Sequence, residues 1–266
     1  MASMLPLLVV LLLLIGGGAA GRPAKAPGKV DYRNQLVVRG KHLSSVEAEV
    51  NGLPVSVDWR AQGAVTTVKD QGDLGTCWAF GAVATVESAY YIKTGHLVPL
   101  SEQQLVDCAG PNMERNSPRI ALEWIASNGG ITSQVDYPYT GKIGQCDNAK
   151  LSHHAATITG YKRTYGQYQR VGADAVAQQP VAVGIAVDPT SFKMYKAGSI
   201  YDGPCIDEKR HCLTVVGYGQ NGADKYWIAK NSYGTKWGDK GYVLLRRGLG
   251  DGGLCKMAVL PVYPTM

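Results

Sequence analysis

The sequence predicts an α+β fold, with helices in the first part of its folded region and strands in the second. Its 266 residues are 45% hydrophobic, which is enough to build a sizeable core. Only 18% are charged and 33 are glycine, so the composition favours a loop-rich globular protein over a disordered or coiled-coil chain. Helical patterns lie before residue 130, and β-branched runs follow Pro180.

Three helices are expected. Apolar residues at core-like spacing predict a buried helix over 77–93, which Gly95 can end. The segment 101–104 (SEQQ) matches a capping box, so a short helix should run to about Cys108. A third helix is predicted over 119–127.

Four short runs in the second half are typical of strands. Each is rich in β-branched or aromatic residues and is bounded by turn-forming residues. They comprise Val181–Val187, Leu213–Tyr218, Lys225–Lys230 and Gly241–Arg247.

The first 20 residues are predicted to be a secretory signal. The apolar run Leu5–Ile15 leads into small residues, with cleavage expected near Ala20 or Gly21. The run is shorter than the ~20 residues of a membrane span, which leaves an uncleaved interfacial anchor as the alternative. Residues 21–54 are expected to form a short pro-segment or linker, and residues 55–266 the folded domain.

The charge pattern argues against nucleic-acid binding. The formal net charge is +6, and no Lys/Arg run exceeds two residues. A metal site is not expected either, because CxxC and HExxH are absent and His153 and His154 would alternate faces in an extended segment.

Among the six cysteines, Cys77 is the first candidate for a catalytic nucleophile. It follows a flexible loop and opens an apolar helix, where the positive end of the helix dipole favours the nucleophilic thiolate. Taken alone, the residue favours a buried structural cysteine, because free cysteines are commonly buried. If Cys77 is a nucleophile, a second thiol must also stay outside the disulfides that the other cysteines can form.

Residues 71–80 read QGDLGTCWAF, residues 210–219 read RHCLTVVGYG and residues 226–234 read YWIAKNSYG. These three windows resemble the motifs of the papain family of cysteine proteases, in its plant-type members. His211 follows Cys77 by 211 − 77 = 134 positions and Asn231 by 231 − 77 = 154, close to the family's separation of about 130–150. The resemblance extends over about 55–266.

The resemblance implies a papain-like two-lobe fold, with a helical N-terminal lobe, an antiparallel β-barrel-like C-terminal lobe and the active site in the cleft between them. Cys77 would attack the scissile carbonyl, and His211 would act as its general base and acid. Asn231 would orient the imidazole, and Gln71 with the Cys77 N–H would form the oxyanion hole. Trp237 is expected near the His211–Asn231 pair, or as an ordinary core aromatic.

The remaining cysteines match family positions for disulfides. By resemblance, Cys108 pairs with Cys146 and Cys205 with Cys255. Cys212 is then the second thiol, which we expect to be a small filler on a strand, able to oxidise with Cys77 if the two face each other.

The resemblance also implies substrate-binding positions. Residues at the P2 pocket are expected to be Pro118, Gly184, Cys212 and Leu260, which are small or apolar and favour an apolar P2 side chain. Asn116 would place a side chain where the family usually has glycine beside the substrate backbone, which predicts altered peptide binding.

Two further features depart from the family pattern. Leu74 stands where a disulfide cysteine is usual, and the segment 113–116 lacks its partner cysteine, so one disulfide worth about 2–5 kcal/mol is expected to be missing. Residues 21–54 are also shorter than the family's inhibitory pro-segment.

The sequence therefore predicts a cysteine endopeptidase that hydrolyses peptide bonds through a Cys77 thioester, without a cofactor. The alternatives are a weak or inactive homologue that acts as a binding or storage protein, and a transferase or ligase with the same thioester. Expected partners are peptide or protein substrates and cystatin-type protein inhibitors, with no nucleic acid and no membrane after signal removal. A monomer is expected in the secretory pathway, extracellular or in a lysosome or vacuole.

Overall fold

A computed structural model describes residues 52–109, 116–164, 168–208, 211–250, 252–257 and 261–266. The chain divides into two units, residues 1–42 and 43–266, and the features below belong to the second. The expected signal, nearly all of the segment 21–54, residues 113–115 and Leu260 lie outside the described residues. No helix among the described residues is long and apolar enough to cross a membrane.

The three predicted helices are present close to their expected bounds. The α-helices are α1 (Cys77–Thr94), α2 (Glu102–Cys108), α3 (Pro118–Ser127), α4 (Tyr168–Gln178) and α5 (Pro189–Lys193), and two short 3-10 helices are η3 (Asn148–Lys150) and η4 (Leu254–Lys256). The sequence analysis did not predict α4 and α5.

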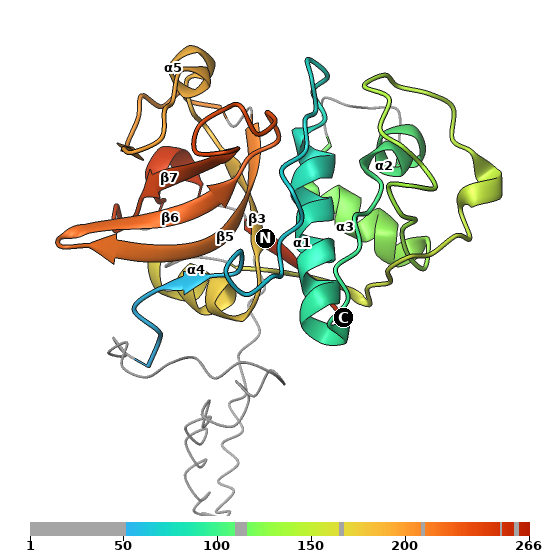
Figure 1. Ribbon diagram of the computed structural model, residues 1–266, viewed down its shortest axis with the longest axis horizontal. Helices are drawn as coiled ribbons and strands as arrows, with labels where there is room; N and C mark the ends of the chain where they lie inside the picture. Colours follow the sequence, from blue (N-terminus) through green and yellow to red (C-terminus); the bar gives the residue numbers. More distant parts are fainter. Residues whose placement is uncertain (1–51, 110–115, 165–167, 209–210, 251, 258–260) are drawn as a thin grey trace, which may run out of the picture. The chain divides into compact units, whose positions relative to one another are not determined.

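Helix α1 is buried along most of its length because it packs between two layers. Its residues from Trp78 to Ala89 are all buried, including those on opposite faces. Gly95 ends it with a left-handed φ of 77° and donates its N–H to the carbonyl of Tyr91. In Figure 1 the sheet lies on one side of α1 while α2 and α3 lie on the other.

The predicted capping box at the start of α2 is only half formed. The Ser101 hydroxyl accepts a hydrogen bond from the Gln104 N–H at 3.0 Å, as expected. The Gln104 side chain instead accepts from the Thr132 N–H at 2.9 Å, and the Ser101 N–H donates to the Thr132 carbonyl at 3.0 Å. In a complete capping box the Gln104 side chain would accept the Ser101 N–H. Here Thr132 is the partner of both groups instead.

The second lobe is an eight-stranded sheet. Its strands are β1 (Val57–Asp58), β2 (Gly160–Arg163), β3 (Val181–Ile185), β4 (Ile200–Tyr201), β5 (His211–Asn221), β6 (Asp224–Lys230), β7 (Tyr242–Arg246) and β8 (Val262–Thr265). They follow the order β2-β8-β3-β5-β6-β7-β4, with β1 paired to β5. The pairs are antiparallel except for the parallel β4–β7 pair, and the order among the described residues has two ends. This open, mainly antiparallel sheet and the helical lobe together form the expected two-lobe α+β fold.

Gly217 permits the close approach of β1 to β5. A Cβ atom there would lie 2.1 Å from the carbonyl oxygen of Val57, a distance that no side chain tolerates. The pairing of Val57 with Tyr218 and Asp58 with Gly217 therefore depends on glycine.

Two hydrophobic cores correspond to the two lobes. One gathers around the sheet and includes Trp227, Tyr218 and Phe192. The other gathers around α1, α2 and α3 and includes Trp78 and Leu122. Helix α1 contributes to both, because Trp78 and Val86 belong to the second core while Tyr91 and Ile92 pack against the first.

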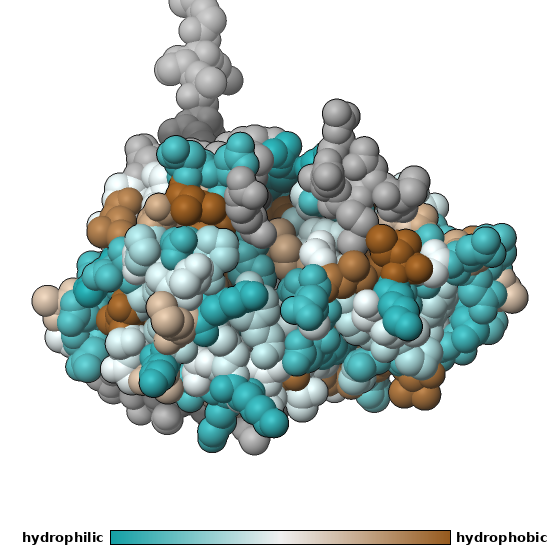
Figure 2. All heavy atoms as spheres, turned by 90° about the horizontal axis from the view of Figure 1, so that it is seen from above, coloured by the Kyte–Doolittle hydropathy of each residue, from teal (hydrophilic) through white to brown (hydrophobic). Residues whose placement is uncertain are grey.

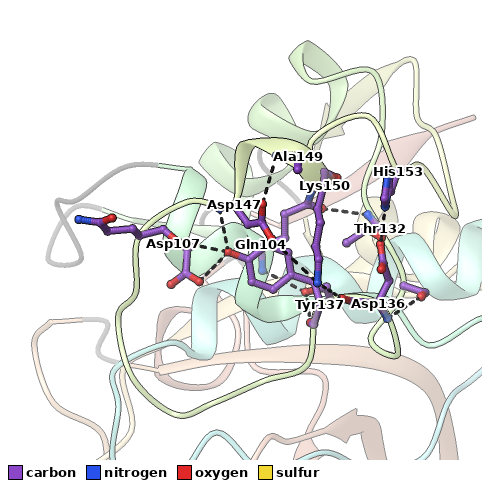
Figure 3. Close-up of polar contacts among 12 residues, drawn as sticks. Gln104, Asp107, Thr132, Asp136, Tyr137, Asp147, Ala149, Lys150 and His153 are labelled. Atoms are coloured by element: carbon purple, nitrogen blue, oxygen red, sulfur yellow. Dashed lines mark hydrogen bonds and ion pairs between the residues drawn. The ribbon is translucent and has the colours of Figure 1, made fainter.

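Side-chain hydrogen bonds hold the irregular segment 129–157 against α2 (Figure 3). Tyr137 donates to the Asp107 carboxylate at 2.9 Å, and Lys150 donates to the Asp136 carbonyl at 2.6 Å. The disulfide between Cys108 and Cys146 joins the end of α2 to the same segment. This long segment, in which η3 is a short 3-10 helix, is thereby tied to the helical core.

Candidate active site

Cys77 is the first residue of α1, and the loop before it is anchored to the other lobe. The Gln71 N–H donates to the Ser232 carbonyl at 2.9 Å, and the Ser232 hydroxyl donates to Gln71 Oε1 at 2.5 Å. Gln71 Nε2 donates to the Leu74 carbonyl at 2.8 Å. Because an amide nitrogen carries two hydrogens, one N–H of Gln71 is still available beside Cys77.

His211 and Asn231 come from neighbouring strands of the sheet lobe. His211 begins β5, and Asn231 directly follows β6, which pairs with β5. His211 Nε2 lies 2.7 Å from Asn231 Oδ1, which also accepts the Ser232 N–H at 2.8 Å. Since Asn231 Oδ1 is an acceptor, Nε2 of His211 carries the hydrogen, and Nδ1 is left to exchange a proton with Cys77.

The Cys77 thiol is held in a state that favours the thiolate. A hydrogen bond from the Cys212 side chain lowers the pKa of Cys77 well below its ordinary value, and burial acts in the opposite direction. The hydrogen bond and charge of His211 lower this pKa further, as does the backbone N–H of Cys212. Cys77 and His211 therefore lie in contact across the two lobes.

An aromatic group covers the His211–Asn231 pair. The Tyr233 ring lies 4.8 Å from the His211 ring at an interplanar angle of 31°, and Phe192 lies 5.8 Å from His211. Trp237 packs against Tyr233 at 5.5 Å and Phe192 at 5.1 Å, so it reaches His211 through these two residues. Burial and the charge of Cys77 raise the pKa of Tyr233 to about 12, which keeps its hydroxyl neutral.

Sequence reasoning missed Tyr233 and Phe192. Tyr233 lies two residues after Asn231, and its position in the same motif was the available signal. Phe192 belongs to the five-residue helix α5, which is too short to show a periodic pattern.

Three of the expected substrate-binding residues meet near α1. A Cβ atom built on Gly81, one turn after Cys77, would lie 3.6 Å from Cys212 Cβ and 3.7 Å from Pro118 Cγ. Gly184 is the β3 partner of Cys212 in the sheet. Asn116 precedes α3 by two residues, and its buried Nδ2 has no hydrogen-bond partner among the described residues.

A buried charge cluster, consisting of Lys69, Glu87, Glu102 and Lys230, lies beneath the site. Lys69 Nζ contacts Glu87 Oε1 at 2.8 Å and Glu102 Oε1 at 2.7 Å. Lys230 Nζ donates to the Thr66 hydroxyl at 2.8 Å, which donates to Glu87 Oε2 at 2.5 Å. Burial raises the pKa of Glu102 to about 7 and lowers the pKa of Lys230 to about 8.

The buried charge cluster is connected to the candidate catalytic residues. Lys230 directly precedes Asn231 in the chain. A void of about 10 Å³, room for about one water molecule, is lined by Asn231 and Cys212 as well as by Lys69, Glu87, Glu102 and Lys230. Asn231 and the buried charge cluster therefore line the same small void.

The histidine pair of the sequence analysis has separate partners. His153 Nδ1 lies 2.8 Å from Asp136 Oδ2 (Figure 3), and His154 Nε2 lies 2.9 Å from the Leu151 carbonyl oxygen. Within the described ranges, no group of three or more His, Cys, Asp or Glu side chains is arranged to hold a metal ion.

The cysteines divide into two disulfides and two thiols. Cys108–Cys146 and Cys205–Cys255 are disulfides, the same pairs that the resemblance implied. Cys77 and Cys212 carry thiols.

Comparison with known proteins gives a consistent set of matches. The family model described as "Papain family cysteine protease" matches residues 53–265. The chain is 44% identical over 218 residues to senescence-specific cysteine protease SAG12 of Arabidopsis thaliana, covering 80% of this chain and 63% of that protein. It is 40% identical over 227 residues to fruit bromelain of Ananas comosus, covering 84% and 64%.

Solved structures agree. The structure of bromelain from Ananas comosus in complex with the E64 inhibitor matches with a TM-score of 0.76 at 43% identity, covering 80% of this chain and 100% of that chain. The proform of the Amb a 11 cysteine protease, a ragweed pollen allergen, matches with a TM-score of 0.77 at 41% identity, covering 83% and 67%. The chain spans about six-tenths of the length of the curated relatives it matches, with shares of 63%, 58% and 64%.

Proposed function

Since the chain belongs to the papain family of cysteine proteases, we propose that it is a cysteine endopeptidase with Cys77 as nucleophile. The observation that carries the proposal is the 2.7 Å contact between His211 Nε2 and Asn231 Oδ1, with Cys77 hydrogen-bonded to His211. A nucleophile, a base and a residue that orients the base are the parts that this chemistry requires.

The first half of the reaction forms a thioester. The Cys77 thiolate attacks the carbonyl carbon of the scissile peptide, and the carbonyl oxygen becomes an oxyanion. The second N–H of the Gln71 side-chain amide and the backbone N–H of Cys77 donate to this oxyanion. The backbone N–H of Cys77 is available because the first N–H groups of an α-helix have no partner within the helix. His211 Nδ1 then gives its proton to the leaving amine, and the C–N bond breaks.

The second half releases the acyl group. A water molecule transfers a proton to His211 and attacks the thioester carbon, and the C–S bond breaks. Asn231 keeps Nε2 of His211 protonated throughout, so the same imidazole serves as acid and then as base. An amine in place of water would give the transferase alternative, which product analysis with added amine distinguishes.

Substrate selection is assigned to the wall formed by Pro118, Cys212 and Gly184. These residues are small or apolar and lie together beside α1, which supports an apolar P2 side chain. Asn116 lies two residues before Pro118 and therefore close to this wall in the chain. An Asn116→Gly variant should therefore change KM for a peptide substrate; unchanged KM and kcat would remove Asn116 from the binding site.

The proposal extends to location and partners. An apolar run followed by small residues at the N-terminus supports entry into the secretory pathway, with an extracellular or vacuolar destination. Peptide substrates and cystatin-type inhibitors are the expected partners. Figure 2 shows that apolar residues on one face form small separate patches among hydrophilic ones, which supports a monomer.

The test combines turnover with active-site labelling. The purified chain is assayed on a fluorogenic dipeptide amide and titrated with a thiol-directed epoxide. We expect turnover, stoichiometric labelling and loss of both in Cys77→Ser. A correctly folded chain that neither turns over substrate nor is labelled contradicts the proposal and favours the inactive-homologue alternative.

A further inference from the structure

Two of the six cysteines are thiols, and both belong to the candidate active site. Cys108, Cys146, Cys205 and Cys255 are consumed by the two disulfides. Cys77 and Cys212 are thiols that are partly exposed to solvent. An apolar pocket wall does not require a thiol, so packing alone does not explain the second sulfur beside the nucleophile.

The backbone brings Cys212 onto the face of α1 that carries Cys77. Gly81 lies one turn after Cys77 on this face, and a Cβ atom there would be 3.6 Å from Cys212 Cβ. The Thr214 hydroxyl donates to the Gly81 carbonyl at 3.1 Å, which holds β5 against the helix at this point.

The contact between the two thiols is direct. The Cys212 side chain and its backbone N–H both hydrogen-bond the Cys77 sulfur. A disulfide requires its two Cβ atoms to lie about 3.5–4.5 Å apart. Rotation about each χ1 angle moves the sulfur and leaves the Cβ atom in place, so the backbone of α1 and β5 sets the Cβ separation while the side chains bring the hydrogen-bonded sulfurs into line for bonding.

We propose that Cys212 is a resolving thiol for Cys77, and that a peroxide converts the pair into a reversible disulfide that switches off the nucleophile. The inference rests on the proposed function, because it assigns regulation to the same nucleophile. It gives Cys212 a role beyond that of a filler on β5.

The reaction balances with a peroxide as the only oxidant. The Cys77 thiolate attacks one peroxide oxygen, the O–O bond breaks, and the departing hydroxide takes the proton held by His211 to become water. The Cys212 sulfur then attacks the sulfenic sulfur of Cys77, the S–O bond breaks, and the hydroxide leaves as water with the Cys212 proton. The two sulfurs lose two electrons, and the peroxide is reduced to two water molecules.

The disulfide inactivates Cys77 and also protects it from further oxidation. A sulfenic acid without a neighbouring thiol reacts with more peroxide to give sulfinic acid, which thiols do not reduce. Attack by Cys212 competes with this second oxidation because the two sulfurs are in contact. A small thiol restores Cys77 by exchange through a mixed disulfide.

The experiment compares the full chain with Cys212→Ala and Cys212→Ser after treatment with an excess of hydrogen peroxide, because sulfinic acid at Cys77 consumes two equivalents of peroxide. Peptides are mapped by mass without reduction, and activity is expressed relative to each protein before treatment. Wild type should give a peptide pair linked through Cys77 and Cys212 and regain nearly all activity with a mild monothiol. Both variants should accumulate sulfinic acid at Cys77 at least about 10-fold faster and stay inactive.

Two controls make the outcome decisive. Cys77→Ser should give no linked peptide, and circular dichroism shows whether each variant is folded. The proposal is overturned if wild type yields no Cys77–Cys212 peptide and its Cys77 reaches sulfinic acid as fast as in the variants. The peptide map does not depend on turnover, so a chain without peptidase activity would still report on the disulfide.

Discussion

Glu102 should make the folded protein less stable as the pH rises through the weakly acidic range. Its carboxylate is buried, shares Lys69 with Glu87, and leaves Oε2 without a hydrogen-bond partner among the described residues. Burial raises its pKa from 4.5 to about 7. The folded state therefore binds a proton that the unfolded chain has already released between these values, and stability declines as the pH increases across them.

The magnitude follows from the size of the shift. A difference of 7 − 4.5 = 2.5 units corresponds to about 3 kcal/mol, at about 1.36 kcal/mol per unit. Glu102→Gln keeps the shape of the neutral acid but cannot ionise. The variant should match wild type near pH 4 and be more stable by up to about 3 kcal/mol near pH 8.

The assay is denaturant unfolding followed by tryptophan fluorescence, in a Cys77→Ser background that prevents self-digestion. Glu87→Gln is the matched control, because Lys69 and Lys230 lower the pKa of Glu87 against the opposing effect of burial. Glu87 contributes stability above its unfolded pKa that is lost as the pH falls, so its removal should destabilise most near neutral pH. If the free energies of unfolding of wild type and Glu102→Gln change in parallel with pH, the raised pKa of Glu102 is refuted as the cause.

Three further predictions concern the candidate catalytic residues. Asn231→Ala removes the acceptor of the His211 imidazole, and kcat/KM should fall about 10- to 150-fold, as expected for loss of a charged hydrogen bond of about 1.5–3 kcal/mol; an unchanged value would remove Asn231 from its orienting role. Tyr233→Ala should expose the His211–Asn231 contact to water and lower kcat/KM, while Tyr233→Phe keeps the covering ring and should retain activity; equal losses in both would show that the hydroxyl matters instead. The lowered pKa of Cys77 predicts iodoacetamide labelling at pH values well below the ordinary thiol range, and Cys212→Ala should shift this profile upward; superimposable profiles would exclude the Cys212 hydrogen bond as a cause.

Sequence reasoning succeeded where a pattern is local. The buried helix from Cys77 was predicted by its apolar spacing and the glycine that ends it, and α1 occupies Cys77–Thr94. The family was recognised because three separate windows carry several matching residues each, and the matching family model covers 53–265. Fold class and family were therefore readable before any contact was known.

Sequence reasoning failed where structure depends on contacts between distant residues. Helix α5 has five residues and is held by its cap, in which Asp188 accepts the Ser191 N–H at 2.8 Å. The order of the strands could not be predicted, because it is a property of pairing and not of any strand's own residues. The buried charge cluster joins residues far apart in sequence, although Glu87 within an otherwise apolar helix was a visible signal.

The two hydrophobic cores place the candidate nucleophile and its base in different lobes of the molecule. Cys77 begins the helix that walls both cores, whereas His211 begins a strand of the sheet. Loosening of either lobe separates the pair before the rest of the chain needs to unfold. A molecule damaged in either lobe would therefore lose the contact between Cys77 and His211 early, and the proposed peptidase activity with it.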